Sequence, residues 1–342
     1  VMACPGLSMG VRRRCNHISA KALWLAALLP AALGCEKESP NGPTPDPGPA
    51  WERLADVNQP REKAGAMAHD GRVFLMGGRG TDPLAPFPGV EVYDPETAVW
   101  ELHDELHALN NTGAVHVAHD GLLYAFSGRA DNGPVSRAIQ VFDPEELTIE
   151  TLRVQLLQGH KDGAGVAIPG GILIMGGLLD VGSPSDLVER FVPNSTAPEM
   201  ETRLPYPLQD FSALHHDGRV FVFGGQSEET RIDSVAVYDL ISREWEVVDN
   251  ALPLGWDQPR AAKAGDRILI MSGKGAAGEL NGEYDPLLHF WRPLADLPEP
   301  RSESAVTVLA GKVWLISGLT GDGEGEVPTA GVLVYDPAAE TE

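Results

Sequence analysis

The sequence predicts an all-β protein in which six four-stranded sheets close into a ring, a six-bladed β-propeller. Three observations carry this prediction. One phrase of eleven residues occurs near both ends of the folded part, an apolar run ending in two small residues recurs six times, and the composition is rich in turn formers. Of the 342 residues, 38 are Gly and 28 are Pro, more than a helical protein would tolerate.

The recurring apolar runs give the period of the repeat. Each run ends in Gly-Gly or Ser-Gly, and the six pairs are Gly77-Gly78, Ser127-Gly128, Gly176-Gly177, Gly224-Gly225, Ser272-Gly273 and Ser317-Gly318. Successive second glycines are 50, 49, 48, 48 and 45 residues apart, a spacing that is typical of repeated structural units. The small residues indicate close backbone approach or positive φ.

Each repeat contains the material for one four-stranded sheet. In the first repeat, residues 64–71 predict an inner strand with an Asp-Gly turn, and residues 72–78 predict a buried second strand. An aromatic residue ends the third strand, and these residues are Tyr93, Phe142, Phe191, Tyr238, Tyr284 and Tyr335. A Trp follows seven residues later in three repeats, at Trp100, Trp245 and Trp291. Such sheets are apolar on both faces, so they need neighbours on both sides.

The repeated phrase predicts how the ring closes. WERLADVNQPR begins at Trp51 and WRPLADLPEPR begins at Trp291, with six of eleven residues identical. The last repeat stops at Glu342, where its outer-strand Trp is due. We therefore expect residues 51–60 to supply the missing outer strand of the sixth blade, which removes an open sheet edge.

The paired glycines, the later Tyr and the spaced Trp resemble the kelch repeat, which builds β-propellers. The resemblance covers residues 51–342 and is weakest in the third repeat, where FVPN replaces Tyr-Asp-Pro. It implies a binding module that presents its loop face to a protein or a glycan. Six-bladed kelch proteins also include a periplasmic sialic acid epimerase, so a sugar-modifying enzyme is the alternative.

The first fifty residues predict export. A basic region with Arg12, Arg13, Arg14 and Lys21 precedes the apolar run 22–34, as in a secretory signal. The end of residues 1–35 resembles the lipobox of bacterial lipoproteins, which implies lipidation of Cys35, although Ala32 stands where that family prefers Leu. Residues 36–50 are a Pro-rich and Gly-rich tether. The expected location is the bacterial cell envelope, as an outer-membrane lipoprotein facing the periplasm or the cell surface, or alternatively a secreted or periplasmic soluble form.

A rim of basic residues is the predicted ligand site. In a propeller the loops before each inner strand and the loops after each glycine pair lie on one face. Positions sixteen residues before each pair and directly after it give the candidate set Arg61, Arg79, Arg129, His160, Trp256, Lys274 and Arg301. Arginines gathered there could bind an acidic glycan or an acidic peptide. Two alternatives stay open: Arg61 and Arg301 could neutralise acids between blades, and Arg260 could replace Trp256.

Composition and motifs exclude several other functions. The net charge of -23 disfavours nucleic acid as a partner. All three cysteines lie in the first 35 residues, so residues 51–342 contain neither a disulfide nor a thiolate metal site. His69, His119 and His216 precede Asp-Gly turns and are interpreted as turn residues. The sequence therefore singles out no catalytic residue, no metal site and no cofactor.

Overall fold

The computed structural model describes residues 50–80, 89–108, 112–130, 133–321 and 325–340. The predicted signal, the lipidation site Cys35 and the tether to residue 49 lie outside the described residues. Within the described part, no helix is long and apolar enough to cross a membrane.

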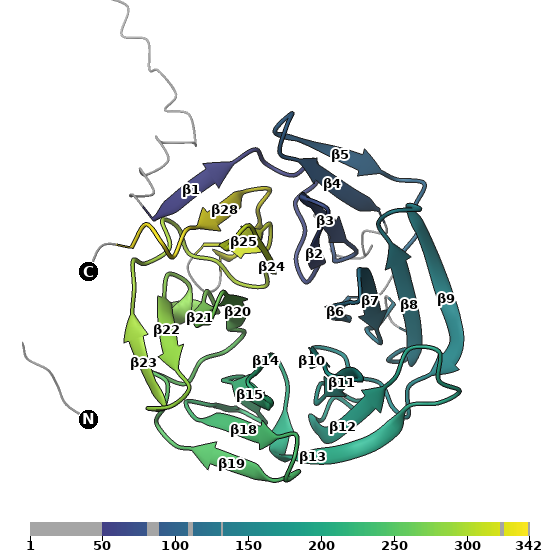
Figure 1. Cartoon of the computed structure of the whole chain (residues 1–342), viewed down its shortest axis with the longest axis vertical. Helices are drawn as coiled ribbons and strands as arrows, with labels where there is room; N and C mark the ends of the chain where they lie inside the picture. The colour runs from purple at the N-terminus through teal and green to yellow at the C-terminus, as the bar shows by residue number, and fades with distance from the viewer. Residues whose placement is uncertain (1–49, 81–88, 109–111, 131–132, 322–324, 341–342) are drawn as a thin grey trace, which may run out of the picture. The chain divides into compact units, whose positions relative to one another are not determined.

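The described chain forms six four-stranded antiparallel sheets around a central axis, as predicted (Figure 1). The first three blades follow the chain in order. They are β2 (Gly65–His69), β3 (Arg72–Met76), β4 (Val90–Asp94) and β5 (Val99–His103); β6 (Val115–His119), β7 (Leu122–Phe126), β8 (Ala138–Asp143) and β9 (Thr148–Gln155); and β10 (Ala164–Ile168), β11 (Gly171–Met175), β12 (Ser185–Phe191) and β13 (Glu199–Leu208).

The remaining blades complete the ring. They are β14 (Ser212–His216), β15 (Arg219–Phe223), β18 (Val235–Asp239) and β19 (Trp245–Val248); β20 (Arg260–Ala264), β21 (Arg267–Met271), β22 (Asn281–Asp285) and β23 (Phe290–Pro293); and β24 (Ala305–Leu309), β25 (Lys312–Ile316), β28 (Val332–Tyr335) and β1 (Trp51–Leu54). Small elements sit in the connecting loops, namely β16 (Gln226–Ser227) with β17 (Thr230–Arg231), η1 (Gly275–Ala277), and β26 (Leu319–Thr320) with β27 (Val327–Pro328).

The predicted closure of the ring is confirmed. β1 pairs antiparallel with β28, with Trp51 opposite Tyr335 and Leu54 opposite Val332. The Trp51 and Tyr335 ring centroids are 4.9 Å apart, and the Trp51 indole donates a hydrogen bond to the Ala295 carbonyl at 3.1 Å. Tyr93 and Trp100 repeat the ring contact in blade 1 at 5.2 Å, and Tyr238 and Trp245 in blade 4 at 4.9 Å. The strand predicted over 51–60 is shorter, because it ends at Leu54.

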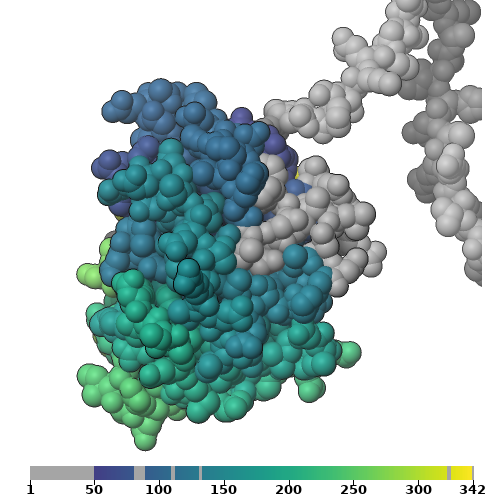
Figure 2. Space-filling view, turned by 90° about the vertical axis from the view of Figure 1, so that its right-hand side faces the viewer, coloured from purple at the N-terminus to yellow at the C-terminus, as the bar shows by residue number. Residues whose placement is uncertain are grey.

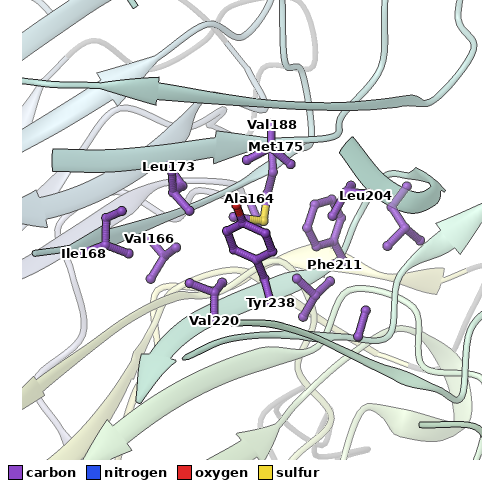
Figure 3. Close-up of a cluster of buried hydrophobic side chains, with 13 residues drawn as sticks. Ala164, Val166, Ile168, Leu173, Met175, Val188, Leu204, Phe211, Val220 and Tyr238 are labelled. Carbon is purple, nitrogen blue, oxygen red and sulfur yellow. The ribbon is translucent and has the colours of Figure 1, made fainter. Parts of the chain in front are cut away.

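The hydrophobic core is divided among the interfaces between blades. Figure 3 shows one such cluster, in which Tyr238 and Val220 of blade 4 pack with Ala164, Met175 and other residues of blade 3. The second strands are buried over nearly their whole length, because each lies between two neighbouring sheets. Figure 2 views the propeller from the side, where the surface runs in chain order from blue through teal to green.

In five of the six small pairs, the second residue must be glycine because the backbone approaches closely. At Gly78, with φ of 89°, a Cβ atom would lie 2.6 Å from the Glu62 carbonyl oxygen. At Gly273 it would lie 2.9 Å from the Asp257 carbonyl oxygen. Atoms at such distances overlap, so these positions accept only glycine. The prediction of close approach from the paired small residues is therefore confirmed.

Replacing Trp51 tests the ring closure. We expect Trp51→Ala to lower the free energy of unfolding by about 3–5 kcal/mol, because it empties a buried site and removes the Tyr335 contact. Chemical denaturation monitored by circular dichroism measures this loss. The matched control is Trp245→Ala, at the corresponding position of blade 4, where the side chain is only partly buried and the loss should be smaller. Deletion of residues 51–57 should abolish the native fold, and an unchanged melting temperature would contradict the closure.

Candidate functional site

The predicted site residues that precede the inner strands are buried between the blades. Arg61, His160 and Trp256 are fully buried, and Arg301 is 1% exposed. These four side chains share one role, since each places an N–H group on the carbonyl oxygen of the first residue of its small pair. The bonds are Arg61 Nη1 to Gly77 at 3.3 Å, His160 Nδ1 to Gly176 at 2.6 Å, Trp256 Nε1 to Ser272 at 2.6 Å and Arg301 Nη1 to Ser317 at 3.3 Å.

Two of these side chains also contact buried carboxylates. Arg61 forms an ion pair with Glu91, and His160 Nε2 lies 2.9 Å from Glu189 Oε1, with all four side chains fully buried. Glu91 also accepts the backbone N–H of Asn58 at 2.6 Å. Burial lowers the pKa of Arg61 to about 10, against the opposing effect of Glu91. Arg301 is paired with Glu299 in the same manner.

The predicted rim therefore needs a correction. Arg61, His160, Trp256 and Arg301 cannot contact a ligand on the surface, because the adjoining blades cover them. Arg61 and Arg301 are instead paired with acidic residues, Glu91 and Glu299, which agrees with the alternative that they neutralise acids between blades. Of the two candidates in the fifth repeat, Arg260 lines the axial channel and Trp256 does not.

The predicted residues that follow the small pairs each contact the loop before the inner strand of their own blade. Antiparallel bridges join Glu62 to Arg79 and Thr112 to Arg129, and the Lys274 N–H donates to the Asp257 carbonyl at 3.0 Å. The loops before the inner strands thus meet the loops after the pairs, as predicted.

The three predicted cations of this loop face, Arg79, Arg129 and Lys274, already have acidic neighbours. Arg79 is paired with Glu62 and keeps 41% of its side chain exposed. Arg129 Nη2 lies 3.9 Å from Asp180 Oδ1. Lys274 lowers the pKa of both Asp257 and Glu326, which burial raises. We call Arg79, Arg129 and Lys274 the outer rim. Ligand binding by the outer rim stays a prediction.

A second ring, closer to the axis, is formed by the residue fourteen positions before each small pair. These residues, which we call the collar, are Lys63, Gly113, Asp162, Asp210, Gln258 and Glu303. All six have left-handed backbone conformation, with φ between 54° and 68°. Backbone hydrogen bonds connect neighbouring members, from Lys63 to Glu303, from Asp162 to Gly113, from Asp210 to Asp162 and from Gln258 to Asp210, at 2.8–3.0 Å.

The side chains of the collar form an ion network centred on Lys63. Its Nζ lies 2.7 Å from Asp162, 3.6 Å from Glu303 and 3.9 Å from Asp210. These carboxylates hold the pKa of Lys63 above its usual value despite burial, and Lys63 with Lys161 holds the pKa of Asp162 below its usual value. Gln258 Nε2 donates to Glu303 Oε1 at 2.9 Å.

The collar borders a cavity of ≈ 470 Å³ that follows the propeller axis. Small residues of the inner strands line most of its wall, together with Arg260, His116 and His215. Burial lowers the pKa of His116 to about 4, and also lowers the pKa of His215. These imidazoles lie three and five residues beyond the collar members of their own strands. The imidazoles therefore belong to the inner strands, whereas the collar residues belong to the loops before those strands.

Sequence reasoning missed the collar, although a signal was present. The same repeat alignment that selected the position sixteen residues before each pair also contains the position fourteen residues before it, where charged and amide side chains prevail. The prediction chose the wrong position in the loop. The side chain sixteen residues before each pair lies between the blades, whereas the side chain two positions later faces the axis.

The comparisons with known proteins agree with this geometry. The Kelch motif matches residues 60–102 and 207–250. The solved structure of YjhT superposes with a TM-score of 0.68 at 14% identity, over 82% of this chain and 96% of YjhT. The chain is a six-bladed β-propeller that contains kelch repeats. Kelch propellers are typical protein-binding modules.

Kelch-repeat proteins of animals and plants are similar to this chain. Kelch-like protein 35 of Mus musculus is 25% identical over 266 residues, which cover 78% of this chain and 44% of that protein. Alpha-scruin of Limulus polyphemus is 24% identical over 79% of this chain and 26% of its own length. An F-box/kelch-repeat protein of Arabidopsis thaliana is 34% identical over 82 residues, or 24% of this chain and 21% of its own. The chain thus spans less than half the length of these relatives.

The buried role of Arg61 can be tested by stability. We expect Arg61→Ala to lower the free energy of unfolding by about 3–5 kcal/mol, because it leaves the Glu91 carboxylate buried without its partner. Urea denaturation measures the change. Arg129→Ala, which removes a partly exposed cation, should cost less than about 1 kcal/mol. Equal effects of the two substitutions would contradict the assignment of Arg61 to the blade interface.

Proposed function

We propose that this propeller is a binding module that recognises a protein partner through its loop face. The observation that carries the proposal is the arrangement of that face, where loops from all six blades meet around the collar and present the outer rim. Each outer-rim cation stands beside a carboxylate, so the surface offers alternating charges. A folded protein surface can match such alternating charges.

The mixed charge of the loop face changes the expected ligand. An acidic glycan or acidic peptide needs cations that are free to face it, whereas four of the seven predicted residues are buried. The remaining cations, Arg79, Arg129 and Lys274, would bring Glu62, Asp180 and Asp257 with them. A protein partner is therefore favoured over an acidic glycan.

The alternative of a sugar-modifying enzyme, similar to the sialic acid epimerase, has less support. General acid and base groups must both reach the substrate. Among the described residues, His116 and His215 make no hydrogen bond to a collar carboxylate. The enzyme alternative stays a prediction without a contact that favours it.

Photo-crosslinking tests the proposed face. With p-benzoylphenylalanine in place of Arg129, we expect a discrete crosslinked protein from cells of the source organism, identified by mass spectrometry. The same group in place of Glu150, exposed on the outer strand β9, is the matched control. With the purified partner, Arg129→Glu combined with Lys274→Ala should weaken binding about tenfold, as removing charges from a contact rim does. Equal crosslinking from both positions, or unchanged affinity, would contradict the proposal.

The proposed location rests on the sequence of the first 35 residues. We propose an exported lipoprotein of the bacterial cell envelope, with the lipid on Cys35, and a secreted or periplasmic soluble form as the alternative. Growth with an alkyne-tagged fatty acid should label the wild-type protein, whereas Cys35→Ser should not be labelled and should leave the membrane fraction. Labelling of Cys35→Ser equal to that of the wild type would contradict lipidation at this residue.

A further inference from the structure

Glu303 stands at the centre of a group of carboxylates contributed by several blades. We call Glu62, Asp210, Asp257, Glu303 and Glu326 the Glu303 cluster. Burial raises the pKa of Glu62 to about 7 and of Asp210 to about 6, and it also raises the pKa of Asp257 and Glu326. In all four, the charge of Glu303 adds to the effect of burial. Negative charge is therefore concentrated around Glu303.

These carboxylates come from neighbouring parts of the ring. Asp257 precedes β20 of blade 5, Glu303 precedes β24 of blade 6, and Glu62 precedes β2 of blade 1. Glu62 is 3% exposed, and Asp257 and Glu303 are each 6% exposed. Burial, and after it the nearby charge of Glu303, raise the pKa of Glu62, so Glu62 keeps its proton more readily than an exposed carboxyl does.

Three buried acceptor atoms, in the Glu303 cluster and in the adjacent Gln258, have no hydrogen-bond donor. Within the described residues, Asp257 Oδ1, Gln258 Oε1 and Glu303 Oε2 make no hydrogen bond. Gln258 is 5% exposed, and both Gln258 and Glu303 line the axial cavity. A buried acceptor without a donor costs free energy, so these atoms favour a ligand that carries N–H groups.

Lys63, Arg79, Arg231 and Arg260 make their contacts with atoms other than the three free acceptors, and Lys274 acts on Asp257 and Glu326 through its charge. Lys63 lies closest to Asp162, and its Nζ is 3.6 Å from Glu303 Oε1 rather than from the unpaired Oε2. Arg79 is paired with Glu62, and Arg231 Nε lies 3.7 Å from Asp257 Oδ2 rather than from Oδ1. Arg260 donates to two backbone carbonyls, of Ser304 at 2.6 Å and of Pro259 at 3.1 Å.

We propose that the Glu303 cluster binds a primary ammonium group, whose N–H donors satisfy the free oxygens of Asp257, Gln258 and Glu303. Lys63 shows that the collar accepts this chemistry, because its own ammonium already lies among three collar carboxylates. The group can come from a free amine that enters the cavity or from a lysine side chain. The site goes beyond the proposed function, since an amine would bind whether or not a protein docks on the loop face.

Binding of the cation should depend on pH with a defined sign. Protonated Glu62 loses its proton when a cation approaches, because a positive charge favours the ionised carboxylate. The charged groups that act on Glu62 are Glu303 from the neighbouring blade, Arg79 across the bridge and Lys63 from its own loop. With a pKa of about 7 in the free protein, affinity should rise about tenfold from pH 6 to pH 8.

Calorimetric titration with two probes tests the site. The probes are n-butylammonium and the peptide acetyl-Gly-Lys-Gly-amide, with n-butanol as the uncharged comparison and constant ionic strength. We expect at least one cationic probe, but not butanol, to bind the wild type and release protons. Glu303→Gln should weaken this binding at least tenfold, whereas Glu150→Gln, on the outer strand, should not change it. Tighter binding of butylammonium indicates a free amine, and tighter binding of the peptide indicates a lysine side chain.

A second substitution tests the same site if the Glu303→Gln variant does not fold. Asp257→Asn removes another free oxygen and should also weaken binding while the circular dichroism spectrum stays native. The proposal is overturned if neither cationic probe binds the wild type, or if Glu303→Gln and Asp257→Asn fold and bind as the wild type does. These results leave protein docking at the outer rim unaffected, because that docking is measured with Arg129 and Lys274 variants.

Discussion

The structure depends on one close approach that is repeated around the ring. In each case the second glycine of a small pair packs against a backbone carbonyl, which belongs to the residue fifteen positions before the first residue of that pair. At Gly78 this carbonyl belongs to Glu62, and at Gly318 it belongs to Ser302. The contact fixes the loop before the inner strand against the end of the second strand. Because no side chain fits between them, the loop is held in one path, and the residues on either side of the contact point in fixed directions.

That fixed path explains why nearby side chains of the loop point in different directions. One position before the contact, Arg61 turns between the blades, and one position after it, Lys63 turns towards the axis with φ of 56°. The loop is short and its backbone conformation is set in each blade, so this alternation recurs whatever side chain is present. The scaffold therefore repeats, while the chemistry facing the axis varies from Lys63 to Gly113 to Glu303.

The fold could be predicted from the sequence, because its signals are tied to backbone geometry. Paired small residues predict close backbone approach. The repeated sequence that begins at Trp51 predicts that the outer strand of the sixth blade comes from residues before the first blade. The site could be predicted only in part. Residue type suggested that Arg61 and Arg301 face a ligand, since charged side chains are seldom fully buried unless paired. Their partners, Glu91 and Glu299, could not be recognised without knowing which residues lie opposite them.

The residues at the Arg61 position show that a charge in this sequence need not contribute to the surface potential. His160 and Trp256 make the same bond to the carbonyl of the small pair, and Trp256 makes it without any charge. A buried ion pair adds little over a well-packed neutral side chain, because desolvation offsets its attraction. Four of the six repeats therefore use an N–H donor at this position, whereas the fourth repeat has the apolar Leu208 there, also fully buried. The groups that shape the field at the loop face are those of the collar and the outer rim, where one repeat differs from the next.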